Sequence, residues 1–382
     1  MMKTNSGIYI HIPFCRKKCL YCDFYSEPCD DARLRAEYTK ALIGEINYYG
    51  QKYSKNLKAD TIFFGGGTPS LMEPELIDSI IKALKKAFSI TEDAEITMEC
   101  NPATLDNEKL RGYKAAGVNR LSIGSQSFDE EVLSGLGRIH SAKDIETTVK
   151  AAREAGFDNI SLDLMFAVPK QTMAKWKDSL EKTLSLKPEH LSFYSLEIAE
   201  GTPFGKMHEE GTLEETSIEE DRKMYHYALE RIKAAGYNHY EISNACLPGR
   251  EARHNLKYWD LSDYLGLGPS AHSYIGGERH SNSADLRRYI EAGGVDCIEE
   301  SYINDLEDDA VEYTFTALRT KEGVSFEVFR EKFGQEFWDF HSEAKKEFEG
   351  YVQGGFAEED CEHIALTQKG IDISNKIMAL FV

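Results

Sequence analysis

One stretch near the start of the chain indicates both its fold and its chemistry: His11-Ile12-Pro13-Phe14-Cys15-Arg16-Lys17-Lys18-Cys19-Leu20-Tyr21-Cys22-Asp23-Phe24. Its three cysteines are spaced C-x3-C-x2-C and follow an apolar run, residues 7–14, that predicts a strand. Three thiolates on one short loop can bind three irons of a [4Fe–4S] cluster, whose full ligation normally takes four cysteines. The fourth iron then lacks a protein ligand, and an open coordination position is typical of a catalytic metal site.

Three other uses of these cysteines are a zinc site, a redox pair or buried thiols. Zinc sites usually combine a C-x2-C pair with a second such pair or with histidines, and no second pair lies nearby. The cluster is therefore the favoured interpretation. The remaining cysteines occur singly, as small buried thiols do: Cys29, Cys100, Cys246, Cys297 and Cys361.

Length and composition predict a cytoplasmic protein with one large domain and a smaller one. The chain has 382 residues, of which 41% are hydrophobic and 29% charged. No apolar stretch approaches the roughly 18 residues of a membrane span. Residues 1–7 lack the pattern of a signal peptide, so we expect a reducing compartment and free thiols.

The net charge of −20 argues against a protein that binds nucleic acid by neutralising phosphates. Residues 301–382 contain 18 Asp and Glu against 8 Lys and Arg, which leaves −10 there. We interpret this region as a solvated acidic surface, with a docking face as the alternative. Arg16, Lys17 and Lys18 have the opposite sign and can attract an acidic electron donor such as a flavodoxin, although loop charges also serve solubility.

The first 200 residues alternate strand-like and helix-like segments. Strands are predicted at residues 7–14, 61–65, 95–100, 120–125, 160–168 and 191–198, and helices at 32–49, 74–88, 106–116, 142–155 and 173–184. Gly50, Gly117 and Gly156 are expected to end helices. Six βα units predict a parallel sheet with helical crossovers. A full eight-fold barrel needs about 250 residues, so the fold class is α/β with a partial (βα)6, TIM-like barrel.

Unusual residues cluster at the predicted carboxyl ends of the strands, where parallel α/β folds place their active sites. The cysteine loop follows the first strand, and Gly65-Gly66-Gly67-Thr68-Pro69 follows the second. Glu99 and Asn101 end the third strand, Gln126 ends the fourth, and Asp163 lies in the fifth. The sequence therefore predicts one site at this edge of the sheet. A hydrogen-bonded strand end is the structural alternative for each residue alone.

The later part of the chain predicts two further regions beyond a barrel at residues 1–235. Residues 236–300 are expected to connect the domains. Residues 301–382 predict short helices, a hairpin around residues 357–366 and a last helix from about residue 370. This smaller, mainly helical domain resembles a winged helix, although its acidity makes DNA binding improbable.

The C-x3-C-x-aromatic-C pattern resembles the radical S-adenosylmethionine (radical SAM) superfamily. In that superfamily the amino and carboxylate groups of SAM occupy the open iron, and an electron from the cluster cleaves SAM to a 5′-deoxyadenosyl radical. The protein supplies position and electrostatics for this cofactor chemistry. The resemblance matches Gly66, Gly67 and Thr68 to the motif that holds the methionine amino group, and Tyr21 to the position near the adenine.

Longer phrases resemble the HemN/HemW family, which is named for oxygen-independent coproporphyrinogen III oxidase. These phrases lie at residues 9–15, 65–70, 119–126 and 169–172. The resemblance implies a radical SAM fold with a HemN-like C-terminal domain. By position it also implies SAM contacts at Tyr9, Glu99, Gln126, Arg138 and Asp163.

Two features distinguish the branches of this family. HemN-like oxidases have a further cysteine two residues after the third, whereas Cys22 is followed here by Asp23 and Phe24. The phrase His254-Asn255-Leu256-Lys257-Tyr258-Trp259, with Tyr240-Glu241-Ile242-Ser243-Asn244 upstream, is similar to the heme-chaperone branch. Residues 165–169 and 245–247 depart from the usual phrases by apolar exchanges.

The resemblance implies a protein that binds heme or a porphyrin and delivers heme to recipient hemoproteins, with the membrane periphery as one place of delivery. An imidazole is a competent heme ligand, and aromatic rings stack on porphyrins, so His254 is a candidate ligand. A structural histidine packed beneath an aromatic pair is the equal alternative. A coproporphyrinogen III oxidase, or a radical enzyme acting on another substrate, remains open as the activity.

Overall fold

A curved sheet of twelve strands forms the body of the protein in the computed structural model, which describes residues 5–53 and 57–382. The prediction that residues 1–7 form no signal peptide concerns in part residues 1–4, which lie outside the described residues. The sheet contains a run of parallel strands in the spatial order β11 (Tyr264–Leu267), β1 (Ser6–Ile12), β4 (Lys58–Gly66), β5 (Ser89–Cys100), β6 (Arg120–Gln126), β7 (Ile160–Phe166) and β8 (His190–Ser195).

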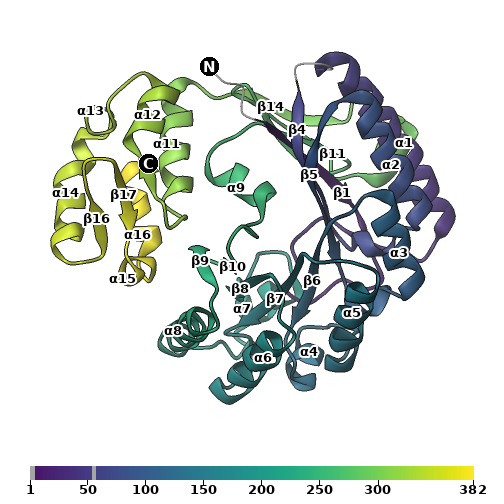
Figure 1. Ribbon diagram of the computed structural model, residues 1–382, viewed down its shortest axis with the longest axis horizontal. Coiled ribbons are helices and arrows are strands. Elements are labelled where there is room, and N and C mark those ends of the chain that lie inside the picture. Colours follow the sequence, from purple (N-terminus) through teal and green to yellow (C-terminus); the bar gives the residue numbers. More distant parts are fainter. Residues whose placement is uncertain (1–4, 54–56) are drawn as a thin grey trace.

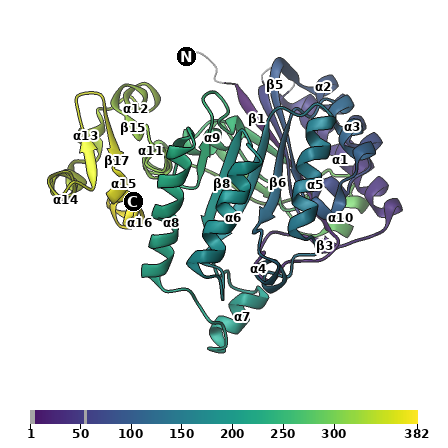
Figure 2. The same cartoon turned by 60° about the horizontal axis from the view of Figure 1, so that its bottom comes forward.

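Helices cover the outer face of this sheet, which confirms the predicted partial (βα)6 barrel (Figure 1). They are α1 (Ala32–Tyr53), α2 (Pro74–Ala87), α3 (Asn107–Ala116), α5 (Ala142–Glu154), α6 (Met173–Ser185) and α8 (Ile218–Ala234). Each turns an apolar stripe inward, as α2 does with Ile77, Ile80, Ile81 and Leu84. Figure 2 shows α5, α6 and α8 side by side on this outer layer.

Local capping explains most helix boundaries. A capping box between Ser141 and Asp144 begins α5, and Gly117, with φ of 111°, ends α3 as predicted. Gly50 was expected to end α1, and that prediction is wrong, because α1 continues to Tyr53. A Cβ at Gly50 would lie 2.7 Å from the Cβ of Ala87, so this glycine allows α1 and α2 to pack closely.

The segment expected to connect the domains, residues 236–300, instead extends the sheet at both edges. One edge gains β10 (Asn244–Cys246) and β9 (Asn238–Glu241), and the other gains β12 (His272–Ile275), β13 (Glu278–Asn282) and β14 (Ile298–Ile303) beyond β11. Helix α9 (Arg253–Trp259) lies on the inner side of the curved sheet, and α10 (Leu286–Glu291) contacts α1 (Figure 1). This segment therefore belongs to the sheet as well as linking the barrel to the C-terminal unit.

The C-terminal unit has its own aromatic core, which includes Phe329, Phe337 and Phe348. Its elements are α11 (Leu306–Ala317), β15 (Val324–Ser325), α12 (Phe326–Phe333), α13 (Phe337–Phe340), α14 (Ser342–Gln353), β16 (Ala357–Glu359), β17 (His363–Leu366), α15 (Gln368–Ile371), α16 (Ser374–Met378) and η4 (Ala379–Phe381). The antiparallel pair β16–β17 is the predicted hairpin. Within the described residues, no helix has both the length and the apolar character needed to span a membrane.

Short elements surround the carboxyl ends of the parallel strands and shape the pocket found there. They are β2 (Phe14–Cys15), β3 (Glu27–Pro28), η2 (Pro69–Leu71), η3 (Pro102–Thr104), α4 (Glu130–Gly135) and α7 (Pro203–Glu209). Neither α4 nor α7 was predicted from the sequence. Both are too short for a hydrophobic period to be recognised.

Candidate functional site

A pocket of about 150 Å³ lies at the carboxyl ends of the parallel strands. Among the residues that line it are all but two of the predicted site residues: Cys15, Cys19, Tyr21, Cys22, Gly66, Gly67, Thr68, Glu99, Gln126, Arg138 and Asp163. Tyr9 and His254 are not among the lining residues. The structure thus gathers residues of β2, β4, β5, β6 and β7, of the cysteine loop, and of the segments after β4 and α4 around a single cavity.

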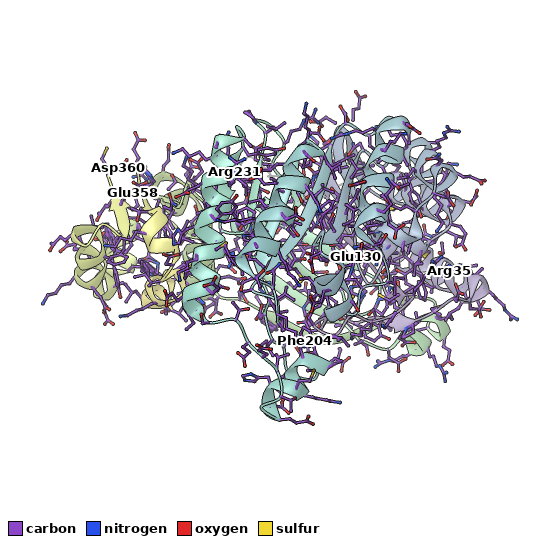
Figure 3. The ribbon with its side chains drawn as sticks, turned by 90° about the horizontal axis from the view of Figure 1, so that it is seen from below. Arg35, Glu130, Phe204, Arg231, Glu358 and Asp360 are labelled. Carbon is purple, nitrogen blue, oxygen red and sulfur yellow. The ribbon has the colours of Figure 1, made fainter. Side chains whose placement is uncertain are left out.

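The cysteine loop is held by backbone hydrogen bonds on both sides. The N–H of Leu20 donates to the carbonyl of Leu136, and the N–H of Phe204 donates to the carbonyl of Leu20. Phe204 is buried in a small apolar cluster against which Leu20 and Tyr21 pack, and Figure 3 shows it where α7 meets the barrel. Helix α7 therefore helps to fix the loop, although nothing in its sequence predicted this role.

The three cysteine thiols are free and face different neighbours. The Cys15 sulfur lies 3.4 Å from the hydroxyl of Thr68, and Arg138 Nη1 donates to the Cys19 sulfur over 3.5 Å. Burial raises the pKa of the Cys22 thiol to about 11. In the described part of the chain, no three His, Cys, Asp or Glu side chains converge on a single ion. Separate thiols lining one cavity suit a multi-iron cluster, whose irons sit at separate corners.

Two glycines bring the end of β4 against the cysteine loop. The N–H of Gly67 donates to the carbonyl of Ile12 over 2.8 Å, and the N–H of Thr68 donates to that of Phe14 over 2.7 Å. A Cβ at Gly67 would lie 2.7 Å from the Phe14 carbonyl oxygen. Gly66 has a φ of +105°, and a Cβ there would lie within 2.8 Å of the His11 ring. Only glycine meets both conditions without displacing the loop.

Two half-buried carboxyl groups, Glu99 and Asp163, line the pocket together. Burial, and then the charge of Asp163, raise the pKa of Glu99 to about 8. Burial likewise raises the pKa of Asp163, although the Ser122 hydroxyl donates to both of its oxygens over 3.1 Å. A cationic ligand would relieve this repulsion. The sulfonium and ammonium groups of SAM have this charge, so the residues present fit SAM.

Gln126 and Arg138 line the same pocket together with Tyr194, a residue that sequence reasoning missed. The hydroxyl of Tyr194 donates to the side-chain oxygen of Gln126 over 3.1 Å. Arg138 donates to the carbonyl of Gly124 over 2.8 Å, and its buried Nε has no hydrogen-bond partner among the described residues. That unpartnered donor fits an anionic ligand group such as a carboxylate. Tyr194 lies inside the predicted sixth strand, residues 191–198, and only the observed end of β8 at Ser195 brings it to a strand end, so the sequence carried no local signal for it.

The two predicted residues outside the lining lie deeper in the barrel. The Tyr9 ring stacks on His254, with centroids 6.5 Å apart. His254 is 1% exposed; its Nδ1 lies 2.8 Å from the Thr61 hydroxyl and its Nε2 lies 2.9 Å from the Tyr258 hydroxyl. Burial, aided by Lys257, lowers the pKa of His254 to about 3. Both ring nitrogens are occupied, so this geometry supports the structural alternative over the predicted heme ligand.

Comparison with known proteins extends over both units of the fold. Residues 9–183 match the model of the Radical SAM superfamily, and residues 304–373 match that of the HemN C-terminal domain. The heme chaperone HemW of Bacillus subtilis is 37% identical over 98% of each chain. The chain belongs to the HemW family of radical SAM proteins. The HemW of Lactococcus lactis is 32% identical over 100% of this chain and 98% of its own. The HemW of Synechocystis is 40% identical over 75% of this chain and 70% of its own.

Membership in the HemW family brings the cofactors of radical SAM proteins, a [4Fe–4S] cluster and SAM. Among solved structures, coproporphyrinogen III oxidase (HemN) of Escherichia coli matches with a TM-score of 0.86 over 99% of this chain and 90% of its own. The identity is 23%, so this likeness confirms the predicted fold class but does not establish a shared activity.

Proposed function

We propose that the protein is a heme chaperone that binds heme and delivers it to recipient hemoproteins. The observation that supports this most is the full-length likeness to relatives named heme chaperone HemW. The sequence between Cys22 and Tyr25 agrees with it, since Asp23 and Phe24 stand where HemN-like oxidases have a further cysteine.

In this proposal the pocket at the strand ends is the cofactor site. Cys15, Cys19 and Cys22 hold three irons of the cluster. Gly66, Gly67, Thr68, Gln126 and Arg138 would hold SAM, and Glu99 and Asp163 would face its positive charges. Tyr21 borders the adenine, and Tyr9 supports the site from below. When bound, the cluster and SAM supply one-electron chemistry, while the protein orients both groups and keeps water out.

The proposed partners follow from the surface around this pocket. Arg16, Lys17 and Lys18 are exposed at its rim, and they suit an acidic electron donor of the flavodoxin type. Recipient hemoproteins receive the heme, some of them at the membrane. We therefore place the protein in the cytoplasm, with peripheral contact to the membrane during delivery.

Anaerobic purification followed by two assays tests the proposal. We expect stoichiometric uptake of added heme, and no decarboxylation of coproporphyrinogen III when SAM and a reductant are present. Two decarboxylations per turnover would instead identify an oxidase. In a companion variant with all three cluster cysteines changed to alanine, iron and sulfide should fall to background, whereas Cys361→Ala, at an exposed cysteine, should retain them.

A further inference from the structure

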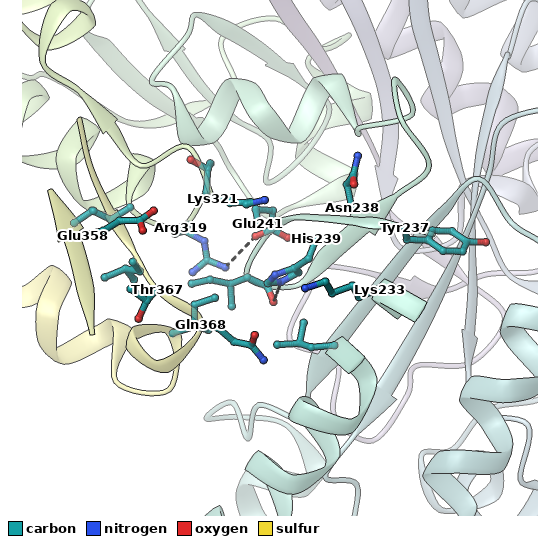
Figure 4. Close-up of a pocket in the computed structure, with 16 residues that line it drawn as sticks. Lys233, Tyr237, Asn238, His239, Glu241, Arg319, Lys321, Glu358, Thr367 and Gln368 are labelled. Atoms are coloured by element: carbon teal, nitrogen blue, oxygen red, sulfur yellow. Dashed lines mark hydrogen bonds and ion pairs between the residues drawn. The ribbon is translucent and has the colours of Figure 1, made fainter. Parts of the chain in front are cut away.

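A second cavity, separate from the cofactor site, lies where the C-terminal unit meets the barrel. It measures about 400 Å³ and is lined by α8, β9, the segment after α11, and the β17–α15 turn (Figure 4). Small-molecule sites typically measure about 300–1,000 Å³ and often lie between domains. Neither the cluster nor SAM occupies this region in the function proposed above.

Both units contribute apolar side chains to the walls of this interdomain pocket. Leu229 and Ile242 come from the barrel, and Leu318, Leu366 and Ile371 come from the C-terminal unit. A flat apolar ligand can therefore be covered on two sides by groups that belong to separate units. Such a ligand would also be released when the two units separate.

His239 gives this pocket a candidate metal ligand. Its Nε2 donates to the carbonyl of Ile242 over 3.2 Å, and no hydrogen bond reaches its Nδ1 from the described part of the chain. Histidines that bind metals usually donate their other ring N–H to a carbonyl or carboxylate, which fixes the tautomer. His239 differs here from His254, whose ring nitrogens are both engaged.

Cationic side chains surround the same pocket. Lys233, Arg319 and Lys321 line it, and the buried Nε of Arg319 has no partner among the described residues. Oε2 of Glu241, a residue 1% exposed, also lacks a hydrogen-bond partner there and lies 3.9 Å from Arg319 Nη2. The three cationic side chains suit a ligand that carries carboxylates.

We infer that this interdomain pocket is the heme site, with the imidazole of His239 as an axial iron ligand and Lys233 and Lys321 as partners of the propionates. The inference rests on the proposed heme binding and specifies where the heme lies. An apolar macrocycle, a metal and two carboxylates match the walls, the free ring nitrogen and the cations of one cavity.

Titration of the full-length, cluster-containing protein with ferric heme tests the axial ligand. We expect His239→Ala to lose the absorption and electron paramagnetic resonance signals of histidine-ligated heme and to bind heme at least about ten-fold more weakly. Added imidazole should restore the signals. His254→Gln, which can keep a hydrogen bond to Thr61 or Tyr258, and His208→Ala on exposed α7 should retain the wild-type spectrum.

Heme dimethyl ester tests the propionate contacts. The wild type should prefer heme over the ester, and the Lys233→Gln/Lys321→Gln variant should lose most of that preference. Lys150→Gln/Lys182→Gln, at lysines of α5 and α6 away from the pocket, is the matched control. If the wild type binds heme and His239→Ala gives an unchanged spectrum, this location is wrong while the chaperone function stands. If the wild type binds no heme, the proposed function itself fails.

Discussion

Gly67 offers a direct test of how the cofactor pocket is built. An alanine Cβ at this position would lie 2.7 Å from the carbonyl oxygen of Phe14 and 3.0 Å from that of Ile12. Both neighbours are backbone atoms of the strand segment that leads into Cys15, so no side chain can rotate away. Relief requires β4 and the cysteine loop to move apart, which also weakens the hydrogen bond from the Gly67 N–H to Ile12.

We expect Gly67→Ala to lower the free energy of unfolding by about 3 kcal/mol, at the upper end of the cost of overpacking, because the contacts are with backbone. The same displacement should misplace Cys15 and reduce the iron and sulfide bound per chain. Urea unfolding and iron analysis on anaerobically reconstituted protein measure the two effects. Gly135→Ala is the control, because no atom lies within 4 Å of the added Cβ. Wild-type iron content together with the unfolding midpoint of the control would refute the reasoning.

Three further changes test separate parts of the structure. Glu99→Gln should stabilise the SAM-free protein more at pH 8.5 than at pH 6. The pKa of Glu99 is raised to about 8, so the wild-type carboxyl becomes charged, and its burial costs more, as the pH rises over this interval. Unfolding midpoints at the two pH values measure this trend, and the exposed Glu75→Gln should not show it. Arg138→Gln should weaken SAM binding by about ten-fold or more in equilibrium titrations, since a charged hydrogen bond contributes about 1.5–3 kcal/mol, whereas the exposed Arg111→Gln should not. Gly50→Ala should destabilise the protein by about 1–3 kcal/mol despite its better helix propensity, and Ala87→Gly in the same chain should recover part of that loss; a stable single variant would show that the helices can separate freely.

The barrel and most of the cofactor site were predictable because their signals are local. A cysteine loop, a glycine turn and single acids each follow a strand, and parallel strands bring their carboxyl ends to one edge. Gly66 and Gly67 illustrate this, since the need for close backbone approach can be inferred from the motif before the neighbouring atoms are known. The helix boundaries at Gly117 and Ser141 follow local capping chemistry in the same way.

The wrong or missing predictions involve contacts between distant parts of the chain. Gly50 has the local signature of a helix end, but its role depends on Ala87, which belongs to the next helix. The hydrogen-bond partner of His254 at Thr61 is 193 residues away. A heme ligand and a structural histidine are therefore indistinguishable from the letters around His254. His239, directly before the upstream phrase that begins at Tyr240, has no local mark of a pocket in the sequence, because half of that pocket belongs to the C-terminal unit.

The phrases that separate this branch from its relatives meet outside the lining of the cofactor pocket. The guanidinium of Arg319 lies over the Trp259 ring at 4.5 Å and pairs with Glu241, whose side chain also accepts a hydrogen bond from Asn244. Trp259 belongs to the His254–Trp259 phrase, whereas Glu241 and Asn244 belong to the upstream phrase.

Backbone hydrogen bonds reinforce this joint between residues 240–244 and the segment after α11. The N–H of Ile242 donates to the carbonyl of Arg319, and the N–H of Lys321 donates to the carbonyl of Tyr240. The joint forms one wall of the interdomain pocket. The residues matched to the wider superfamily line the cofactor pocket instead. Differences in activity between proteins that share this fold should therefore be sought where the barrel meets the C-terminal unit.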